Sequence, residues 1–248
     1  MKVSIITITY NSAETVEDTI QSVLSQDYSN VEYIIIDGAS RDDTMAIVNR
    51  YRDKIATIIS ESDKGIYDAM NKGVSVATGD IVGILNSDDF YADSNVITDV
   101  VASMKQTNSD ACYADLVYVD KEDTSRVVRS WKSGEYTPGF FLRGWMPPHP
   151  TFFLKRSMYQ KYGLYSLELR SSADYELMLR MVHKHGISLS YLPRVITNMR
   201  TGGQSNVTIK NRWKANREDR LAWKMNGLQP GLFTLVRKPL SKLLQYLK

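Results

Sequence analysis

The chain has 248 residues, 43% of them hydrophobic and 24% charged, a composition that excludes a disordered or fibrous protein and suits a sizeable globular core. Its formal net charge is only +3, so the protein as a whole is neither strongly basic nor strongly acidic. The single cysteine, Cys112, excludes an internal disulfide framework and favours a reducing compartment.

The first ~100 residues alternate between strand patterns and helix patterns. Apolar, β-branched runs predict strands at residues 3–9, 31–36, 55–59 and 81–85. Apolar residues at helical spacing predict helices at 16–26, 44–51 and 66–76, the first of them capped by Asn11 and Ser12. Strands that alternate with helices form a parallel sheet with crossover helices, so we expect an α/β fold with a mostly parallel central sheet.

Polar residues follow three of these predicted strands, at positions 9–11, 37–40 and 86–89. In an open parallel sheet, ligands bind beyond the carboxyl ends of the strands. We therefore expect the three polar strand ends to converge on one crevice.

The second half of the chain is less regular. Residues 96–104 predict a helix, residues 111–119 and 126–131 predict short strands, and residues 174–185 predict a second strong helix. A stretch rich in glycine, proline and aromatic residues occupies positions 136–150. From Gln204 onward the pattern is that of a basic helical region, broken near residues 227–231 and ending in an amphipathic stretch.

The strongest local signal is the tetrapeptide Asn86-Ser87-Asp88-Asp89 at the end of an apolar strand. Adjacent carboxylates repel each other and lose hydration when buried, and a hard divalent cation offsets both costs. A cluster that caps the next helix, together with Asp93, is the competing interpretation.

Asp37 also stands at a strand end, where a carboxylate can accept a hydrogen bond from a nucleobase or a ribose hydroxyl. Asp42 and Asp43 follow it and are better explained as caps of the next helix. Asp37 is therefore the candidate binding residue of this segment.

Five segments occur in the order seen in family 2 glycosyltransferases, and the chain resembles a bacterial, non-processive member of that family. They are SIITITYN (4–11), IDGASRDDT (36–44), DKGIYDAMNKG (63–73), TGD (78–80) and LNSDD (85–89). The resemblance is specific over residues 3–90, moderate over 149–205 and absent in the tail. It implies a GT-A fold with a Rossmann-like nucleotide-binding core. The glycosyltransferase domain would span 1–204, divided into a nucleotide-sugar half (1–107) and an acceptor half (108–204), before a tail at 205–248.

The resemblance also implies roles for single residues. Thr9, Tyr10 and Asn11 would border the nucleobase, Asp37 would bind it, and Asp63 would lie near base and ribose. Asn86, Ser87 and Asp88 would form the Asp-x-Asp element, with Asp88 as the principal ligand of a Mn²⁺ or Mg²⁺ cofactor. Asp174 would be the catalytic base.

Two positions depart from the family pattern. The family usually has Asp where this chain has Asn86, so one ribose or metal contact is neutral here. It usually has Glu before the base, where this chain has Ala173, so Asp174 would act alone.

General chemistry supports a carboxylate such as Asp174. When an acceptor hydroxyl attacks an anomeric carbon it must lose its proton, and a carboxylate within hydrogen-bond reach can take it. A bound metal offsets the charge of the leaving diphosphate. The competing interpretation is that Asp174, which follows Ser171 and Ser172, only caps a helix.

Three further side chains are candidates for substrate binding. His149 lies between prolines that fix its backbone, and it could meet the acceptor, complete the metal shell or be purely structural. Trp145 could offer its face to an acceptor sugar, although buried packing is the ordinary role of such a ring. Arg200 precedes Gly202 and Gly203 in a segment that could close over the donor diphosphate, with a plain turn as the alternative.

The tail is strongly basic while the rest of the chain is net acidic. Residues 205–248 contain ten Lys or Arg, against only Glu218 and Asp219. This asymmetry indicates an anionic partner, a membrane surface or nucleic acid. Leucines interspersed with the basic residues favour a helix in a membrane interface, and packing on the protein's own core or on a partner subunit is the alternative.

The sequence contains no signal peptide and no run of about 18 apolar residues. We therefore expect a cytoplasmic protein, peripheral on the inner face of the membrane and without a nucleic-acid partner.

The predicted function is an inverting transferase that adds one sugar from a nucleoside-diphosphate sugar, UDP by resemblance, to a glycan or lipid-linked acceptor. The expected setting is the assembly of repeat units for a bacterial surface polysaccharide. A sugar nucleotidyltransferase is the nearest alternative, but the glycine-rich phosphate loop it needs is missing after the first strand. A decayed, nucleotide-binding scaffold protein is the other alternative, because Asn86 and Ala173 replace acidic residues.

Overall fold

The computed structural model describes residues 1–202, 209–231 and 234. Its strands are β1 Val3–Thr9, β2 Val31–Asp37, β3 Thr57–Ser60, β4 Ile81–Asn86, β5 Asp89–Tyr91, β6 Ala111–Val119, β7 Val127–Trp131, β8 Phe153–Lys155 and β9 Leu189–Arg200. Its helices are α1 Val16–Leu24, α2 Thr44–Arg50, α3 Ile66–Val76, α4 Val96–Thr107, α5 Arg156–Tyr162, α6 Ala173–Met178 and α7 Ile209–Met225. Short 3₁₀ turns lie at Arg52–Lys54, Phe140–Arg143 and His149–Thr151, and a π-helical segment at Leu179–Lys184 follows α6.

Within the described residues, the nine strands form one sheet in the order β3-β2-β1-β4-β8-β6-β9-β5, with β7 paired to β6. The four strands β3, β2, β1 and β4 run parallel. β8 is antiparallel to both β4 and β6, whereas β6 and β9 run parallel. The expected α/β fold with a mostly parallel sheet is confirmed.

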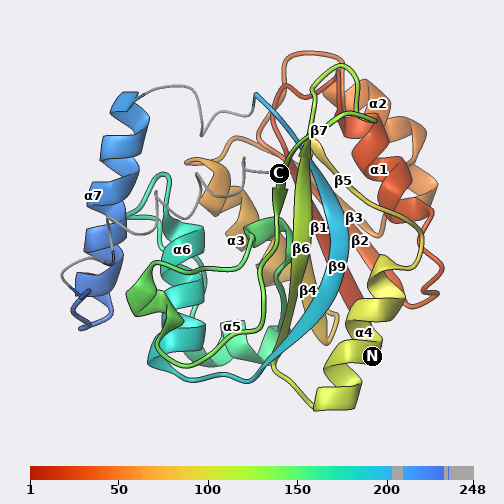
Figure 1. Cartoon of the computed structure of the whole chain (residues 1–248). Helices are drawn as coiled ribbons and strands as arrows, with labels where there is room; N and C mark the ends of the chain where they lie inside the picture. Colours follow the sequence, from red (N-terminus) through yellow and green to blue (C-terminus); the bar gives the residue numbers. More distant parts are fainter. Residues whose placement is uncertain (203–208, 232–233, 235–248) are drawn as a thin grey trace.

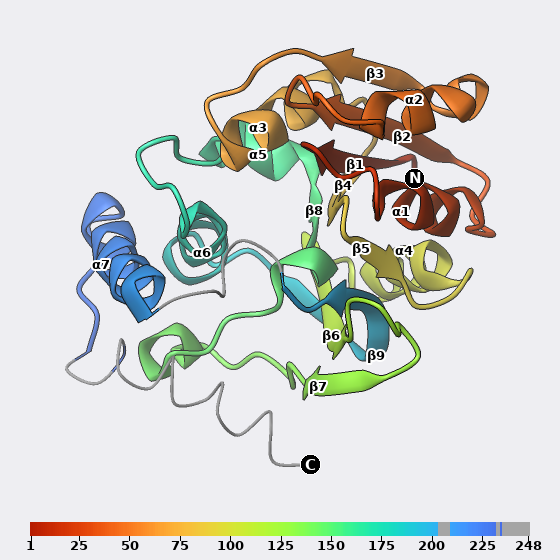
Figure 2. The same ribbon diagram turned by 90° about the horizontal axis from the view of Figure 1, so that it is seen from above.

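Helices cover both faces of this sheet (Figures 1 and 2). α1, α2 and α4 lie on one face, and α3, α5 and α6 lie on the other, with α7 outside α6. A separate hydrophobic core lies on each face of the sheet, and alternate residues of β1 point into one or the other. Ile5 packs on the α1 side and Ile6 on the α3 side, and both are fully buried. Strands buried on both faces are apolar throughout, which is why these segments read as unbroken apolar runs.

Two contacts fix the helices on the α3 side. The backbone of α3 approaches β1 so closely at Gly73 that a Cβ atom there would overlap the side chain of Ile6. α7 docks on α6 through the buried Trp223, whose indole nitrogen donates to the Tyr175 hydroxyl at 2.9 Å.

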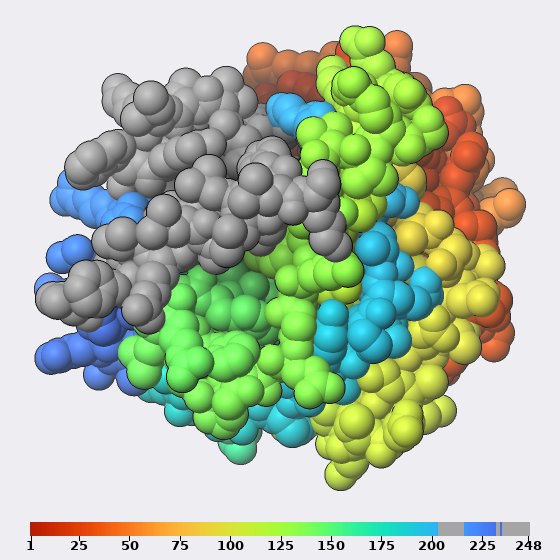
Figure 3. Space-filling view, viewed as in Figure 1, coloured from red at the N-terminus to blue at the C-terminus, as the bar shows by residue number. Residues whose placement is uncertain are grey.

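The second half of the chain holds most of the differences from expectation. β5, β8, α5 and the twelve-residue β9 were not predicted. β9 pairs with β6 about 80 positions earlier in the chain, for example Cys112 with Ser190, and it reaches the surface between α4 and β7 (Figure 3). The predicted helix 174–185 is α-helical only to Met178 and continues as the π-helical segment.

The basic region after residue 204 is helical as far as it is described, as α7, and the chain turns at Gly227 with φ +67°. The amphipathic stretch beyond it lies outside the described residues. No helix among the described residues is long and apolar enough to cross a membrane.

Candidate active site

The loops at the carboxyl ends of β1, β2 and β4 meet, as predicted. The Gly38 amide donates to the Thr9 carbonyl at 2.9 Å, which joins the β1 and β2 ends. The Ser87 hydroxyl donates to the Ser12 hydroxyl at 2.8 Å, which joins the β4 end to the loop after β1. One continuous polar rim therefore borders the sheet edge where α/β proteins bind ligands.

Asp37 organises the loop that follows β2. Its buried carboxylate accepts hydrogen bonds from the Ser40 amide at 3.1 Å, the Ser40 hydroxyl at 2.5 Å and the Ser60 hydroxyl at 2.6 Å. Most of its acceptor capacity is used within the protein, and its predicted direct contact with a nucleobase stays a prediction.

Tyr10 and Asp63 flank the same corner of the site. A Cβ atom at Gly38 would lie 2.6 Å from a carboxylate oxygen of Asp63 and 3.3 Å from the ring of Tyr10, so only glycine fits between them. The Tyr10 side chain is 54% exposed, and an exposed ring beside a carboxylate suits stacking and hydrogen bonding to a nucleobase.

Asn11 does not cap α1, contrary to the prediction. Its φ is +48°, and its side-chain oxygen accepts a hydrogen bond from the Arg41 amide at 2.8 Å. α1 starts later, after Thr15 as N-cap. Asn is among the few residues that tolerate the left-handed conformation, and here it ties the β1 loop to the β2 loop.

The acidic turn between β4 and β5 is electrostatically costly in the protein alone. Burial raises the pKa of Asp88, although the nearby Arg200 guanidinium opposes the rise. Asp89 is fully buried, and burial together with the Asp88 charge holds its pKa well above the usual range. Asn86 donates its side-chain amide to Asp89 at 3.1 Å.

This turn fits a divalent cation. Among the described residues, Asn86 Oδ1 and Asp89 Oδ1 are buried without a hydrogen-bond partner. Within the same residues no three His, Cys, Asp or Glu side chains form a site that could hold a metal unaided. A metal held by Asp88 and the amide oxygen of Asn86 would therefore draw its other ligands from water and a substrate diphosphate, as Mg²⁺-type ions commonly do.

Arg200 is the last residue of β9 rather than part of a loop, which corrects the expected position. Its guanidinium donates to the Asp88 carbonyl at 3.0 Å, forms an ion pair with Asp18 of α1 and lies 4.8 Å from the centre of the Phe90 ring. With 6% of its surface exposed, Arg200 is buried and holds the backbone of the acidic turn through the Asp88 carbonyl.

Asp174 lies in the first turn of α6, where Ser172 is the N-cap. Its carboxylate accepts a hydrogen bond from the Tyr67 hydroxyl of α3 at 3.0 Å. The side chain therefore reaches across to the nucleotide-binding half and does not cap its own helix. Ala173, where the family usually has Glu, is fully buried.

His149 belongs to the same cluster as Asp174. Its Nε2 atom lies 3.2 Å from the Tyr165 hydroxyl. Burial lowers the pKa of His149, and the Asp174 charge only partly opposes this, so the surroundings favour the neutral imidazole. Its use as an acceptor ligand or a metal ligand stays a prediction.

Trp145 is engaged in packing. Its indole nitrogen donates to the Ser133 carbonyl at 2.8 Å, and its ring packs against Tyr113, Tyr136 and Phe141. The residue is half-buried, and its predicted contact with an acceptor sugar stays a prediction.

Sequence reasoning missed Tyr67 and Tyr165, which connect the two halves at Asp174. Their rings stack with centroids 5.9 Å apart. Tyr67 stands inside the family-like segment 63–73, and that placement was the available signal. Nothing in the local pattern of Tyr165 indicates its partner.

The sheet order, the acidic strand end and the opposed helix α6 are those of the GT-A fold. Solved structures agree. TarS of S. aureus, in complex with UDP-GlcNAc, has a TM-score of 0.70 at 19% identity, covering 100% of this chain and 72% of that one. The mannosyltransferase PcManGT of Pyrobaculum calidifontis, with GDP-Man and Mn²⁺, has a TM-score of 0.64 at 16% identity, covering 98% and 80%.

The sequence comparisons specify the family. The model of glycosyl transferase family 2 matches residues 4–165, and the chain belongs to that family. The glycosyltransferase Rv1514c of Mycobacterium tuberculosis is 32% identical over 180 residues, 72% of this chain and 68% of that protein. A PGL/p-HBAD biosynthesis glycosyltransferase of Mycobacterium bovis is 28% identical over 210 residues, 83% and 80% of the two chains.

A further relative matches over a shorter stretch of the chain. It is WfaP of Escherichia coli, a UDP-Glc:alpha-D-GlcNAc-diphosphoundecaprenol beta-1,3-glucosyltransferase, 39% identical over 95 residues, or 38% of each chain. Family membership decides against the sugar nucleotidyltransferase.

Proposed function

We propose that this glycosyltransferase adds one sugar from a UDP-sugar to an acceptor hydroxyl, with inversion at the anomeric carbon. The proposal rests on the position of Asp174. Its carboxylate accepts a hydrogen bond from Tyr67 of α3, and α3 begins shortly after the donor-side residue Asp63. One carboxylate that takes the acceptor proton suffices for direct displacement, and such displacement inverts the centre.

Each part of the site has a defined task in this proposal. Tyr10, Asp37 and Asp63 bind the nucleoside, and Asp88 with Asn86 holds a Mn²⁺ or Mg²⁺ ion. The bound metal supplies positive charge opposite the leaving diphosphate. Asp174 accepts the proton of the attacking hydroxyl.

The acceptor is a lipid-linked glycan in the assembly of a bacterial surface polysaccharide or glycolipid. WfaP acts on a diphosphoundecaprenol-linked sugar, and the exposed face of α7 fits an enzyme that works at an anionic membrane surface. That face carries Arg217, Arg220 and Lys224, and Leu221 and Met225 beside them are 38% and 36% exposed. Cosedimentation with vesicles of phosphatidylglycerol checks the membrane contact.

Calorimetric titration of the protein with UDP, with and without Mn²⁺, tests the donor site. We expect binding that strengthens at least tenfold with the metal, which corresponds to about 1.4 kcal/mol. Binding of GDP instead would correct the nucleobase, and binding of neither nucleotide would refute the donor assignment. UDP release from UDP-glucose and UDP-GlcNAc then identifies a donor, and Asp174→Asn should abolish that release while binding UDP normally.

A further inference from the structure

The cluster around Asp174 contains a residue with no role so far. Tyr67 is 8% exposed, and its hydroxyl lies 3.0 Å from Oδ1 of Asp174. Burial, and then the Asp174 charge, raise the pKa of this phenol far above its usual range, so Tyr67 remains protonated and acts as a hydrogen-bond donor. A permanent donor of this kind fixes the direction in which a carboxylate presents its other oxygen.

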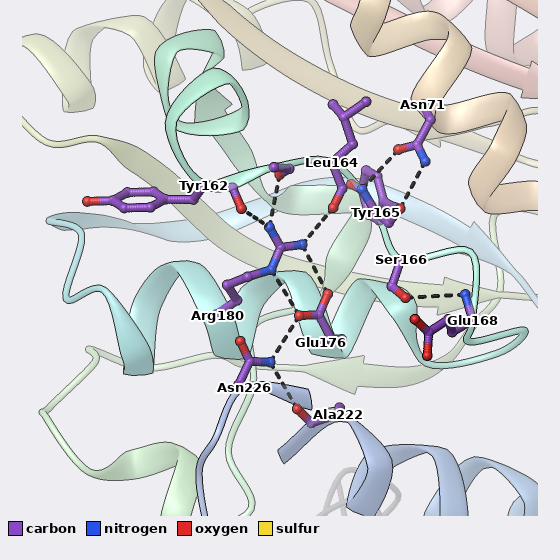
Figure 4. A network of polar contacts seen from close by, with 11 residues as sticks. Asn71, Tyr162, Leu164, Tyr165, Ser166, Glu168, Glu176, Arg180, Ala222 and Asn226 are labelled. Carbon is purple, nitrogen blue, oxygen red and sulfur yellow. Dashed lines mark hydrogen bonds and ion pairs between the residues drawn. The ribbon is translucent and has the colours of Figure 1, made fainter. Parts of the chain in front are cut away.

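The Tyr67 ring is itself held in place. It stacks on Tyr165 with an interplanar angle of 18°. Asn71, one turn further along α3, accepts from the Tyr165 amide and donates to the Tyr165 carbonyl, both at 2.9 Å (Figure 4). The segment that carries Tyr165 is therefore fastened to the helix that carries Tyr67.

A second set of contacts holds the same segment from α6 and the π-helical segment that follows it. The guanidinium of Arg180 donates to the carbonyls of Tyr162, Gly163 and Leu164, and it is ion-paired with the buried Glu176 (Figure 4). Asn226 at the end of α7 donates to the same carboxylate at 2.9 Å. Hydrogen bonds from two helices leave the segment little freedom, so the stacked tyrosine pair is a rigid support.

We propose that Tyr67 is a positioning residue for the catalytic carboxylate of Asp174. Its hydroxyl occupies Oδ1 and leaves Oδ2 to accept the proton of the attacking hydroxyl. Tyr67 is four positions from Asp63, whose carboxylate accepts from the Gly65 amide at 2.8 Å just before α3 begins. The amino end of α3 therefore positions both Asp63, on the donor side, and the carboxylate of Asp174. The inference rests on the proposed function of Asp174.

The test compares Tyr67→Phe, which keeps the ring and removes only the hydroxyl, with the matched variant Tyr33→Phe. Tyr33→Phe also removes one buried hydroxyl, which in the wild type donates a hydrogen bond to the Thr7 hydroxyl at 3.1 Å on the other side of the sheet. UDP release from the accepted UDP-sugar is followed across pH, together with UDP binding and thermal unfolding. We expect kcat of Tyr67→Phe to fall roughly 10- to 100-fold, because small displacements of reacting groups are costly. The donor KM and UDP affinity should stay within about twofold, since neither depends on the base.

The acid limb of the kcat profile should also move to higher pH in Tyr67→Phe, because a carboxylate that loses a hydrogen-bond donor is protonated more easily. Tyr33→Phe should change neither kcat nor the limb.

The outcomes separate the two claims. If Asp174→Asn is inactive and Tyr67→Phe keeps the wild-type kcat and pH profile, the positioning role is refuted and the proposed function stands. Normal turnover of Asp174→Asn would overturn the base assignment and the role of Tyr67 with it.

Discussion

Acidic side chains lie at both ends of the parallel part of the sheet, Glu32 at the amino end of β2 and Asp88 and Asp89 after the carboxyl end of β4, and their surroundings differ. At the amino ends, Glu32 accepts hydrogen bonds from Lys2 at 2.7 Å, from Ser4 at 2.5 Å and from the amide and hydroxyl of Thr78 at 2.8 and 2.6 Å. At the carboxyl ends, beside Asp88, the Oδ1 atoms of Asp89 and Asn86 are buried without a hydrogen-bond partner among the described residues.

The pKa values follow this difference. Burial alone would raise the pKa of Glu32, but its hydrogen bonds outweigh burial and lower the pKa to about 2. For Asp88 and Asp89 burial dominates, and the pKa of each carboxyl is raised. A satisfied carboxylate stabilises the fold, whereas an unsatisfied one marks a place where a ligand is expected to complete the structure.

Removing the acid at the carboxyl end should have the largest effect on turnover. Asp88→Ala should lower sugar transfer by roughly 10³-fold, because the charge that develops on the leaving diphosphate would lose its stabilisation. The strengthening of UDP binding by Mn²⁺ should disappear in calorimetry, while the free energy of unfolding should not fall. Metal-dependent activity that survives in Asp88→Ala would show that the metal is held elsewhere.

Removing the acid at the amino end should instead affect stability. Glu32→Gln should lower the free energy of unfolding by about 2 to 3 kcal/mol, because Lys2 and Ser4 would lose their charged partner. kcat at pH 7 should be unchanged, which urea titration and a turnover assay measure together. Glu14→Gln is the matched control, since Glu14 is exposed in its pair with Lys121 and should show no measurable change.

The same comparison predicts a pH dependence. Because the folded-state pKa of Glu32 is below its ordinary value of 4.5, its contribution is complete above pH 4.5 and is lost as the pH falls toward about 2. Wild-type stability should therefore fall more steeply than that of Glu32→Gln over this window, by a total of about 3 kcal/mol. Parallel curves for the two proteins would show that Glu32 is not protected in this way.

The smallest expected effect is a gain. Asp89→Asn should raise the free energy of unfolding of the metal-free protein by about 1 kcal/mol, since it removes a buried charge beside Asp88 without changing the shape of the side chain. Urea titration in the presence of a chelator measures this. A loss of stability would mean that the Asp89 charge is compensated in the folded protein.

Sequence patterns captured the nucleotide-binding half well. β1 and α3 have the predicted bounds, as does β6 in the acceptor half, because an apolar run or an apolar helical face determines each of them locally. The convergence of the strand ends also followed from strand order alone.

What failed depended on distant partners. β9 contains Pro193 and alternates poorly, and its pairing with β6 and β5, both distant in sequence, makes it a strand. Asn11 was expected to cap α1, but Arg41 on the neighbouring loop engages its side chain. The Tyr67–Asp174 hydrogen bond joins residues 107 positions apart, and no local period encodes such a contact.

The paired hydrogen bonds between Asn71 and Tyr165 also limit how this enzyme could be recombined with its relatives. A chimera that joins one member's donor half to another's acceptor half would place the crossover between these two residues. Such an exchange would preserve the packing inside each half, but Asn71 and Tyr165 would then come from different proteins. Engineering a new acceptor by exchange would therefore need Asn71 of α3 to travel with the acceptor half.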